Sequence, residues 1–377
     1  MAVTLQDARR YPRPTSLTHS LADLTNVQPL RVDGGTVWGT GAGRQLLRST
    51  DEWVNRTLLH TFDETIQWLE PLANGEVIVS TGRGSSTNIR GELFVSSGFA
   101  ANPTGAAWTK VLEASGDQNR FNQWGLHAWG RYVIAGEYGA KGDPDTAARR
   151  VWFSTDHGQT FSVIFDLRDV YPNPDPFNNA HMHCAHIDGY RQLLWVAHGD
   201  TTYRGIYYRP LAGGDWVQIE DNQQPTTITA VPSGVLFGQD GVPNGVLRWT
   251  PDGGLRTAHV INPDHDTALT HVAQRGARDP STGAVWFCFG SALAGTDGVI
   301  LVTNDEGRTV HEVLRVTVDK SGDGVQMVTI PTPSGTMFAR YRDVVYPDGA
   351  QLTGEAPAWI GAALEVAPSG ALRFVAP

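Results

Sequence analysis

Lysine is scarce in this chain of 377 residues, which has three lysines against 26 arginines. Acidic residues outnumber basic ones, the formal net charge is −10, and no run of Lys or Arg occurs. Binding to nucleic acid or to an anionic membrane surface depends on a basic face, which this composition does not supply. We therefore expect no nucleic-acid partner and no membrane insertion.

Cysteine and long apolar segments are scarce as well. The two cysteines, Cys184 and Cys288, lie in separate apolar runs, which favours free buried thiols over a disulfide framework. No segment approaches the roughly 20 apolar residues that cross a bilayer as a helix. Residues 1–14 are polar and lack the apolar centre of a secretory leader, so we expect no signal peptide.

Glycine, proline and tryptophan are abundant, with 42, 22 and 12 residues, while charged residues make up only 18%. A coiled coil or a protein of long helices would tolerate few glycines or prolines, so these classes are excluded. A hydrophobic content of 40% is enough for a sizeable core and excludes disorder over most of the chain.

A short alternating segment that closes near Ser, Thr or Pro recurs seven times, and its first residues are 40 to 58 positions apart. The seven segments are 46–50, 93–97, 151–155, 206–210, 246–250, 300–304 and 344–348. Each is preceded by two further strand-like runs joined by a Gly-bearing turn, and several are followed by a fourth run. Four short strands repeated with a period near fifty residues predict a β-propeller.

We therefore predict an all-β fold with seven blades of four antiparallel strands. A six-bladed ring is the alternative, in which the weak seventh repeat is an irregular terminal segment. Residues 1–25 are expected to form an N-terminal arm and residues 26–377 the propeller. Ring closure commonly joins strands from both ends of a chain, and residues 3–5 or 372–375 are the candidate strands.

The turn between the third and fourth strands of the third repeat reads Ser154-Thr155-Asp156-His157-Gly158-Gln159-Thr160-Phe161. A degenerate copy spans 303–310, and remnants occur at 49–51 and 250–254, all at the same place in their repeats. The motif resembles the Asp-box, or BNR repeat, of sialidase-like propellers. In physical terms, a short carboxylate or hydroxyl accepts backbone N–H bonds in a tight turn, and Gly takes the positive-φ position.

The resemblance implies a sialidase-like fold with the box on the face opposite the usual ligand site. Sialidases combine an arginine triad with a Tyr/Glu pair and an Asp, and their first Arg lies in a Phe/Tyr-Arg-Ile/Leu-Pro motif. Residues 11–14 and 29–32 come nearest to that motif, and neither matches it. The box therefore supports the fold and carries no catalytic role by itself.

The binding face is expected where the inner strands begin and the loops between second and third strands protrude. These loops are long in the second and third repeats, at 83–92 and 137–150, and long loops on a rigid scaffold commonly hold binding residues. The candidate catalytic residues on this face are His127, His183 and Tyr203. The candidate substrate-binding residues are Arg120, Glu137, Tyr138, Asp200, Arg204, Arg340 and Tyr341.

Arginine, tyrosine and histidine are chosen because an arginine pairs bidentately with the carboxylate of an acidic sugar, while Tyr or His moves a proton. Glu137 and Tyr138 are adjacent, but neighbours in a strand point to opposite faces, which weakens them as a catalytic pair. Most tryptophans recur at blade positions and are expected in the core. The candidates for stacking on sugar rings are Trp53, Trp124 and Trp359.

His181 and His183 share one face of a predicted strand, whereas His186 points to the other. Such a pair can supply two metal ligands, with His198 or Asp200 from the adjacent strand as a third. Hydrogen-bonded histidines lining an inner channel are the commoner arrangement, so we predict no metal and no cofactor. The metal site is kept as the alternative.

The leading hypothesis is a glycan-recognising propeller that binds a cell-surface or acidic polysaccharide. The polar arm, the absence of a leader and the Arg-over-Lys bias of GC-rich genomes fit a tail-associated virion protein of a phage. Such a protein recognises its host, contacts neighbouring virion subunits through the arm, and is located in the virion or extracellularly. The alternative is a carbohydrate-active enzyme, either a sialidase-like glycosidase or a polysaccharide lyase, in which an Arg neutralises a uronate.

Overall fold

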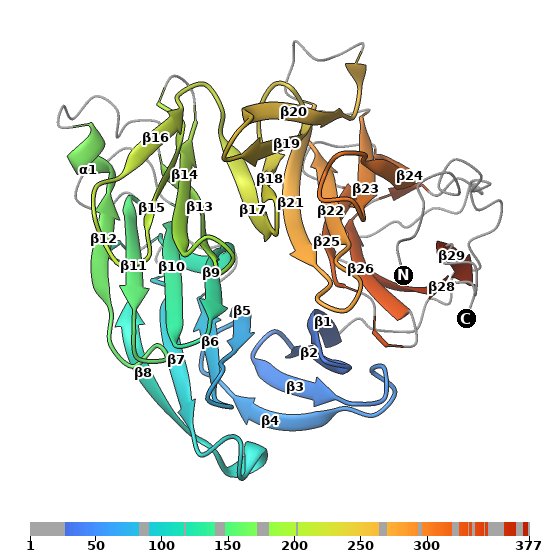
Figure 1. Ribbon diagram of the computed structural model, residues 1–377. Helices are drawn as coiled ribbons and strands as arrows, with labels where there is room; N and C mark the ends of the chain where they lie inside the picture. Colours follow the sequence, from blue (N-terminus) through green and yellow to red (C-terminus); the bar gives the residue numbers. More distant parts are fainter. Residues whose placement is uncertain are drawn as a thin grey trace.

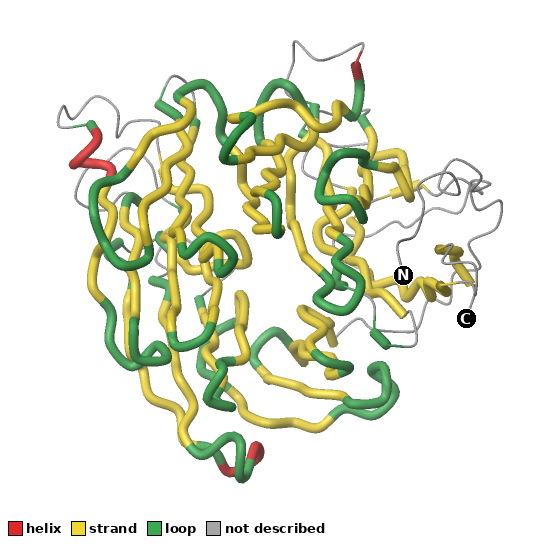
Figure 2. Tube along the Cα trace, viewed as in Figure 1, coloured by secondary structure: helices red, strands yellow, loops and turns green. Residues whose placement is uncertain are grey.

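The computed structural model describes residues 27–82, 90–116, 118–139, 148–171, 181–200, 203–263, 270–292, 296–318, 324–330, 332–333, 336–342, 344–345, 358–366 and 372–375. Their antiparallel sheets stand around a common centre, so the fold is an all-β propeller of four-stranded blades (Figure 1). The helical segments η2 (Pro103–Gly105) and α1 (Leu167–Val170) lie at the rim (Figure 2). No helix of these ranges is long and apolar enough to span a membrane.

Three four-stranded sheets follow one another from the N-terminal side. The first consists of β1 (Val27–Asp33), β2 (Thr36–Gly41), β3 (Gln45–Ser49) and β4 (Thr57–Thr61). The second consists of β5 (Ile66–Pro71), β6 (Val77–Thr81), β7 (Glu92–Ser97) and β8 (Ala107–Glu113). The third consists of β9 (Arg120–Trp129), β10 (Tyr132–Tyr138), β11 (Arg150–Ser154) and β12 (Ser162–Asp166).

Two more four-stranded sheets and one larger sheet complete the described strands. The fourth consists of β13 (His181–Asp188), β14 (Leu193–Gly199), β15 (Gly205–Pro210) and β16 (Val217–Glu220). The fifth consists of β17 (Pro225–Val231), β18 (Gly234–Gln239), β19 (Gly245–Thr250) and β20 (Gly254–Val260). The sixth contains β21 (His271–Arg278), β22 (Val285–Ser291), β23 (Asp297–Thr303), β24 (His311–Val318), β25 (Gly324–Val328), β26 (Thr336–Arg342), β27 (Val344–Val345), β28 (Ala358–Val366) and β29 (Leu372–Val375).

The described strands thus form six sheets, where the sequence predicted seven separate blades. The sixth sheet holds two successive sets of strands, which are joined where Gly290 pairs with Gly324. Gly298 lies beside this junction, and a Cβ added to it would lie 2.9 Å from the Cα of Gly324. The two sets merge because glycines on both sides let the backbones approach within hydrogen-bonding distance.

The prediction that residues 344–348 form the third strand of the seventh repeat is wrong, because the described part of this segment pairs with a different strand set. Val344 and Val345 form β27, which pairs with β24 of the preceding set, and residues 346–348 lie outside the described ranges. The third strand of the last set is β28, and the predicted strand 372–375 is β29 beside it. A Val-Val pair favours a strand but does not specify which sheet edge it joins. Residues 1–26, with the predicted strand 3–5, are not described.

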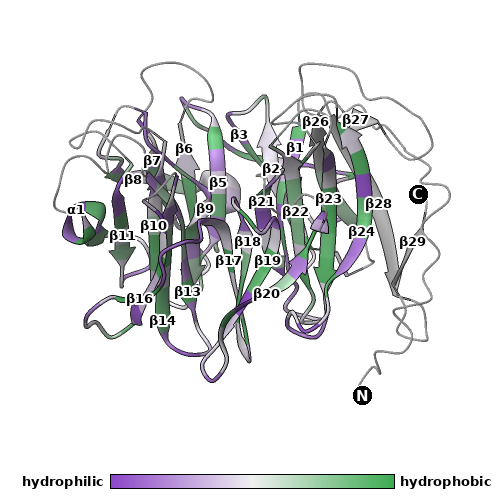
Figure 3. Ribbon diagram, turned by 90° about the horizontal axis from the view of Figure 1, so that it is seen from above, coloured by the Kyte–Doolittle hydropathy of each residue, from purple (hydrophilic) through white to green (hydrophobic). Residues whose placement is uncertain are grey.

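The core lies between neighbouring sheets, so the second strands of the sheets are buried on both faces. β18 is buried along its whole length, and clusters such as Leu69 and Ile78 against Phe121 join successive sheets. Figure 3 shows the apolar strands running between the two faces of the ring. Cys184 and Cys288 are buried and form no disulfide, which confirms the sequence prediction. Such two-sided burial explains why the second strands read as apolar runs with little alternation.

The turn at Asp156 has the hydrogen bonds that its residue types predict. Asp156 Oδ1 accepts from the hydroxyl of Ser154 at 2.7 Å and from the Thr160 N–H at 3.0 Å. The Ser154 hydroxyl in turn accepts from the N–H of Gly158, which has φ +78°. Asp305 makes the same bonds with Thr303 and Thr309 in the sixth sheet. The hydrogen bonds of this turn therefore stabilise the connection between the third and fourth strands of the sheet.

Replacing Asp156 by Ala is expected to lower the free energy of unfolding by about 1–3 kcal/mol, because several hydrogen bonds to a charged acceptor are lost together. Urea denaturation followed by fluorescence measures the change. Gln159→Ala is the control, since Gln159 is exposed and contributes only its backbone N–H to the same carboxylate. Equal stability of the two variants would contradict the assigned role of Asp156.

The first strand of each strand set carries a shift in register near the end at which it enters the ring. In the fourth sheet the pairing passes from Met182 opposite His198 to Cys184 opposite Ala197, so His183 is the extra residue. In the third sheet the shift is larger, because residues 122–125 lie opposite Gly136 alone. Such bulges bend a strand and re-aim the side chains beside them.

Inner strands from distant parts of the chain meet across the channel. The indole Nε1 of Trp124 donates to the carbonyl of Gln274 at 2.7 Å, which joins the third sheet to the sixth. The Arg275 guanidinium lies 4.1 Å from the ring centroid of Trp68 and donates to the Leu30 carbonyl. The channel is therefore closed in part by polar and aromatic side chains.

A buried ion pair belongs to the same group of residues. The carboxylate of Glu70 lies 2.7 Å from the Arg31 guanidinium and accepts a hydrogen bond from the indole N–H of Trp68 at 2.9 Å. Arg275 lies nearby. Burial raises the pKa of Glu70, and Arg31 opposes that shift. Burial lowers the pKa of Arg275 to about 9, so it remains charged at neutral pH.

Glu70→Ala is expected to cost about 3–5 kcal/mol of unfolding free energy, since it leaves the buried Arg275 and the half-buried Arg31 without the nearby carboxylate. The matched control is Glu113→Ala, which removes an exposed partner of Arg90 and Lys110 and should cost less than about 1 kcal/mol. Chemical denaturation of both variants at pH 7 measures the difference. Similar losses for the two would show that burial does not decide the strength of these pairs.

Candidate functional site

The two faces of the ring differ in their chemistry. The entry face is where first strands begin and second strands end, as at Arg120 and Tyr138 of the third sheet. The turn face carries the hairpins between first and second strands, such as residues 72–77, and the turn at Asp156. The candidate site lies on the entry face, where side chains of the third and fourth sheets meet.

His181, His183 and Asp200 form a compact group at this face. The Nε2 atoms of His181 and His183 lie 3.4 and 3.5 Å from the two carboxylate oxygens of Asp200. The histidine side chains are 5% and 1% exposed, whereas that of Asp200 is 21% exposed. The group is therefore buried on its protein side and reached by solvent on the side of the carboxylate.

Backbone carbonyls hold the other nitrogen of each ring. His181 Nδ1 lies 2.9 Å from the Gly139 carbonyl, and His183 Nδ1 lies 3.3 Å from the Gln224 carbonyl. A carbonyl oxygen only accepts, so each Nδ1 carries the proton and donates it. Each ring consequently turns its Nε2 atom toward Asp200.

Local backbone features place these groups. A Cβ added to Gly199 would lie 2.5 Å from Cε1 of His183, so the ring packs directly over the glycine. Asp200 follows with φ +103°, a left-handed conformation that costs a non-glycine residue on the order of 1 kcal/mol. The carboxylate is thus held toward the histidines by a strained backbone.

Tyr138, Trp124 and Arg120 extend the site into the third sheet. The Tyr138 ring lies 4.8 Å from the His181 ring and edge-on to Trp124 at 4.6 Å, and the Arg120 guanidinium lies 5.5 Å from the Tyr138 ring centroid. Burial raises the pKa of Tyr138 to about 12, and Asp240 adds to the shift. The phenol is therefore protonated at neutral pH and acts as a hydrogen-bond donor.

The structure thus brings together Arg120, Tyr138, His183 and Asp200 from the sequence-predicted set. It places Glu137 on the opposite side of β10, where it accepts hydrogen bonds from Ser115 and Trp152 and is fully buried. Burial raises the pKa of Glu137, and the hydrogen bond from Ser115 opposes this. Its interactions are those of a carboxylate that anchors a loop.

His127 lies deeper in the channel than His183. Its ring stacks on His186 with centroids 3.9 Å apart, and its Nδ1 accepts from the Ile187 N–H at 3.3 Å. Residues 183 and 187 are four positions apart on β13, which corresponds to about 13 Å of strand. The two predicted catalytic histidines are therefore not brought into one site.

Tyr203 and Arg204 lie beside the site, on the approach to β15. Tyr203 packs against Tyr171 with ring centroids 5.5 Å apart, and its N–H donates to the Asp200 carbonyl at 3.3 Å. Arg204 donates to the side chain of Asn222. His198 faces this aromatic group, and burial lowers its pKa to about 3.

Of the other candidates, Trp53 is 4% exposed and packs over the backbone of Gly39, so it belongs to the core and offers no surface for a sugar. Trp68, Trp195 and Trp286 are buried as predicted. Arg340 and Tyr341 lie in β26 opposite Met327 and Val325, and their side chains are outside the described part of the chain. Trp359 is likewise described only as part of β28.

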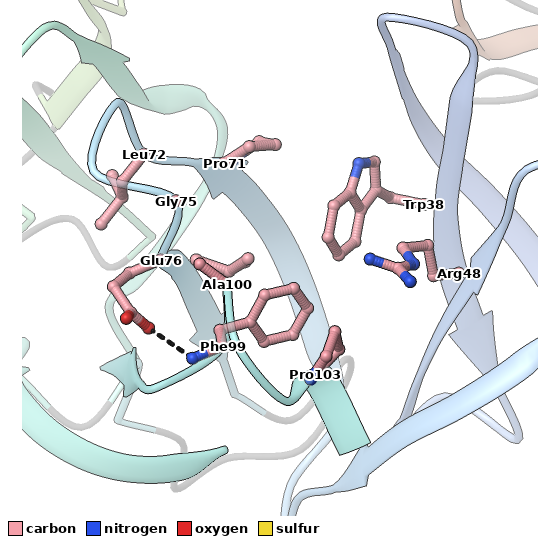
Figure 4. Close-up of a pocket in the computed structure, with 10 residues that line it drawn as sticks. Trp38, Arg48, Pro71, Leu72, Gly75, Glu76, Phe99, Ala100 and Pro103 are labelled. Carbon is pink, nitrogen blue, oxygen red and sulfur yellow. Dashed lines mark hydrogen bonds between the residues drawn. The ribbon is translucent and has the colours of Figure 1, made fainter. Parts of the chain in front are cut away.

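A cavity of about 260 Å³ lies on the turn face between the first and second sheets. Figure 4 shows Trp38 and Arg48 on one side, with Phe99 and Pro103 facing them. Its carboxylate, Glu76, already accepts from the Ser96 hydroxyl and from the N–H groups of Gly98 and Phe99. The polar chemistry of this cavity is thus used to hold a turn, and we place the candidate site on the entry face.

Gln224 was missed by the sequence reasoning. Its carbonyl holds His183, and its side-chain amide donates to the Asp240 carbonyl of the fifth sheet. A usable signal was its position just before residues 226–231, the first strand-like run of the fifth repeat, which corresponds to β13 in the fourth. The sequence indicated His181 only as one half of a His-x-His pair. In the structure its ring faces Asp200 in the same way as that of His183.

Comparison with known proteins shows the fold. No family model matches the chain, and no curated protein matches it either. Among solved structures it is similar to a periplasmic gluconolactonase of Pseudomonas aeruginosa, with TM-score 0.53 and 12% identity over 93% of this chain and 98% of that one. An oligogalacturonate lyase in complex with manganese gives 0.50 and 12% over 74% and 76%.

A prolyl endopeptidase structure shares the fold as well, with TM-score 0.51 and 10% identity over 93% of this chain and 54% of that one. These neighbours have lactonase, lyase and peptidase names. Similarity at this level of identity therefore establishes a β-propeller, and the activity has to be argued from the site.

The stacked histidines of the channel make stability depend on pH. Burial lowers the pKa of His186 to about 3 and also lowers that of His127. Below pH 6.5 the unfolded chain binds protons that the folded chain does not, so stability is full above pH 6.5 and is lost as the pH falls toward 3. His186→Phe should reduce the loss of unfolding free energy between pH 7 and pH 5 by roughly 1–2 kcal/mol.

Urea denaturation of wild type and His186→Phe at both pH values tests this expectation. Comparing the difference between pH values within each protein removes any constant effect of the substitution on packing. An identical pH dependence in the two proteins would mean that His186 is not a neutral buried group.

Proposed function

We propose that the chain recognises an acidic carbohydrate at the entry face, in the site built by Arg120, Trp124, Tyr138, His181 and Asp200. The observation that carries the proposal is the stack of Arg120 on Tyr138 directly beside the histidines. Arg120 supplies the charge that a sugar carboxylate requires. The Tyr138 hydroxyl is a donor for sugar oxygens, and the half-buried Trp124 offers an aromatic edge.

The class of ligand is further supported by the neighbouring folds. The names of a gluconolactonase and an oligogalacturonate lyase both describe sugar acids or their lactones. A uronate-containing oligosaccharide is therefore the ligand to test first, followed by sialylated and arabinan-type glycans.

Recognition is favoured over catalysis because the Tyr138 hydroxyl is protonated at neutral pH. A general base works best with a pKa near the operating pH, and Tyr138 has a pKa of about 12. His127, one of the candidate catalytic residues, lies apart from His183. The alternative function is a sialidase-like glycosidase or polysaccharide lyase. It is supported by the presence of an arginine, Arg120, and a histidine, His183, on the same face of the ring.

We also propose that this is a tail-associated virion protein of a phage. We further propose that it is related to the Asp-box propellers. Its supports are the composition, the polar arm at 1–25 and the Asp-box-like turns. In this proposal the protein is located in the virion or extracellularly, and the arm contacts neighbouring subunits. We further propose that β25, β26, β28 and β29 act as a seventh blade of the ring.

Calorimetric titration with an oligogalacturonate panel tests the function. Arg120→Ala is expected to weaken binding at least tenfold, because a charged pair with the sugar carboxylate is lost. Arg131→Ala is the matched control: Arg131 also stacks on a tyrosine, Tyr132, in the same sheet, but at the turn face. Equal loss in both variants, or no binding of any uronate or sialylated glycan by wild type, would refute the proposal.

The same panel separates recognition from catalysis. After prolonged incubation, recognition predicts intact oligosaccharide, with neither new reducing ends nor the absorbance of unsaturated uronates. Release of either product by wild type and not by His183→Gln would establish the enzyme in place of the binding protein.

A further inference from the structure

We propose that His181, His183 and Asp200 bind one divalent transition-metal ion, of the class of Zn²⁺ or Mn²⁺. One ligand atom from each of the three residues lies within 4.8 Å of the others. Two imidazole nitrogens and a carboxylate oxygen are a donor set that such ions prefer, with further positions open to water or to a ligand.

The distances favour a cation over a direct hydrogen bond. Charge-assisted N–H···O⁻ bonds are typically about 2.7–2.9 Å long. The Nε2 atoms lie 3.4 and 3.5 Å from the Asp200 oxygens, which is longer. Two ligands bound at about 2.1 Å in tetrahedral geometry are separated by about 3.4 Å, so the observed spacing matches the edge of a coordination polyhedron.

The ring orientations point the same way. Because the Gly139 and Gln224 carbonyls lie against the Nδ1 atoms, the Nε2 atoms of both rings face the Asp200 carboxylate. Metal-bound histidines in proteins almost always have this outer hydrogen bond to a carbonyl or carboxylate.

Two features of the backbone serve this group of ligands. His183 is the extra residue of the bulge in β13, and the bulge directs its ring over Gly199. Asp200 adopts φ +103° although glycine would adopt it without strain. A strained residue that presents a carboxylate to two buried imidazoles is more readily explained by a ligand than by packing.

The ion would lie next to the sugar site. Tyr138 contacts His181, so a carbohydrate held by Arg120 and Tyr138 would reach the open side of the ion at Asp200. This last point rests on the proposed function, whereas metal binding itself does not. A bound divalent ion would add a second positive centre for an acidic sugar.

The test titrates chelator-treated wild-type protein with Zn²⁺ and, separately, with Mn²⁺, in the absence of any sugar. One ion per chain is expected, and Asp200→Asn and His183→Gln should each weaken binding at least tenfold. His271→Gln is the matched control: His271 is buried and begins the first strand of the sixth sheet, as His181 does in the fourth, and the variant should bind like wild type.

A stability measurement guards against misfolded variants. Asp200→Gly removes the ligand while relieving the left-handed strain, so its unfolding temperature in chelator is the reference for its own response to metal. Added Zn²⁺ or Mn²⁺ should raise the unfolding temperature of wild type and leave that of Asp200→Gly unchanged. Failure of wild type to bind either ion, or equal thermal shifts in the two proteins, would overturn the metal site.

Sugar binding measured with and without chelator keeps the two proposals separate. Metal binding without affinity for any acidic glycan would refute only the proposed function. Glycan binding by a wild-type protein that binds neither ion would refute only the metal site.

Discussion

The structure depends on the convergence of inner strands around a channel narrow enough for side chains to cross it. The bond from Trp124 to the Gln274 carbonyl and the Arg275 guanidinium over Trp68 join sheets that are far apart in the chain. Polar groups at such depth must be satisfied, and Glu70 and the backbone carbonyls satisfy them. This requirement positions the first strands, and everything on the entry face is attached to their ends.

The site also depends on the register shift that the first strands share. The extra residue is Gln67 in the second sheet, Thr226 in the fifth and Gln274 in the sixth. Among the described first strands, only that of the fourth sheet has a histidine there, with His181 before it and Asp200 at the end of the adjacent strand. The bent scaffold is therefore repeated, while the chemistry belongs to one sheet and its neighbour.

The two faces divide the polar residues by task. At the turn face, Asp156, Asp305 and Glu76 use their oxygens to organise turns, and little capacity remains for a ligand. At the entry face, Arg120 and Tyr138 meet the histidine group. The carboxylate of Asp200 is turned toward two imidazoles and partly toward solvent. Recognition and metal binding are both argued from that difference.

The sequence by itself determined the strand repeat, the turn at Asp156 and the burial of both cysteines, because each follows from local periodicity or local hydrogen bonding. It also determined that Arg120, Tyr138, His183 and Asp200 belong to one face. It did not separate Glu137 from Tyr138 in role or show that Trp53 is buried, because both depend on what the neighbouring strand or turn packs against.

Only the tertiary structure decided which of these residues meet. The union of the last two strand sets depends on a close approach of glycines 34 residues apart. The convergence of His181 and His183 on Asp200 depends on a bulge, on the packing of a ring over Gly199 and on carbonyls from two other sheets. These are long-range contacts, and no local pattern in the chain encodes their distances.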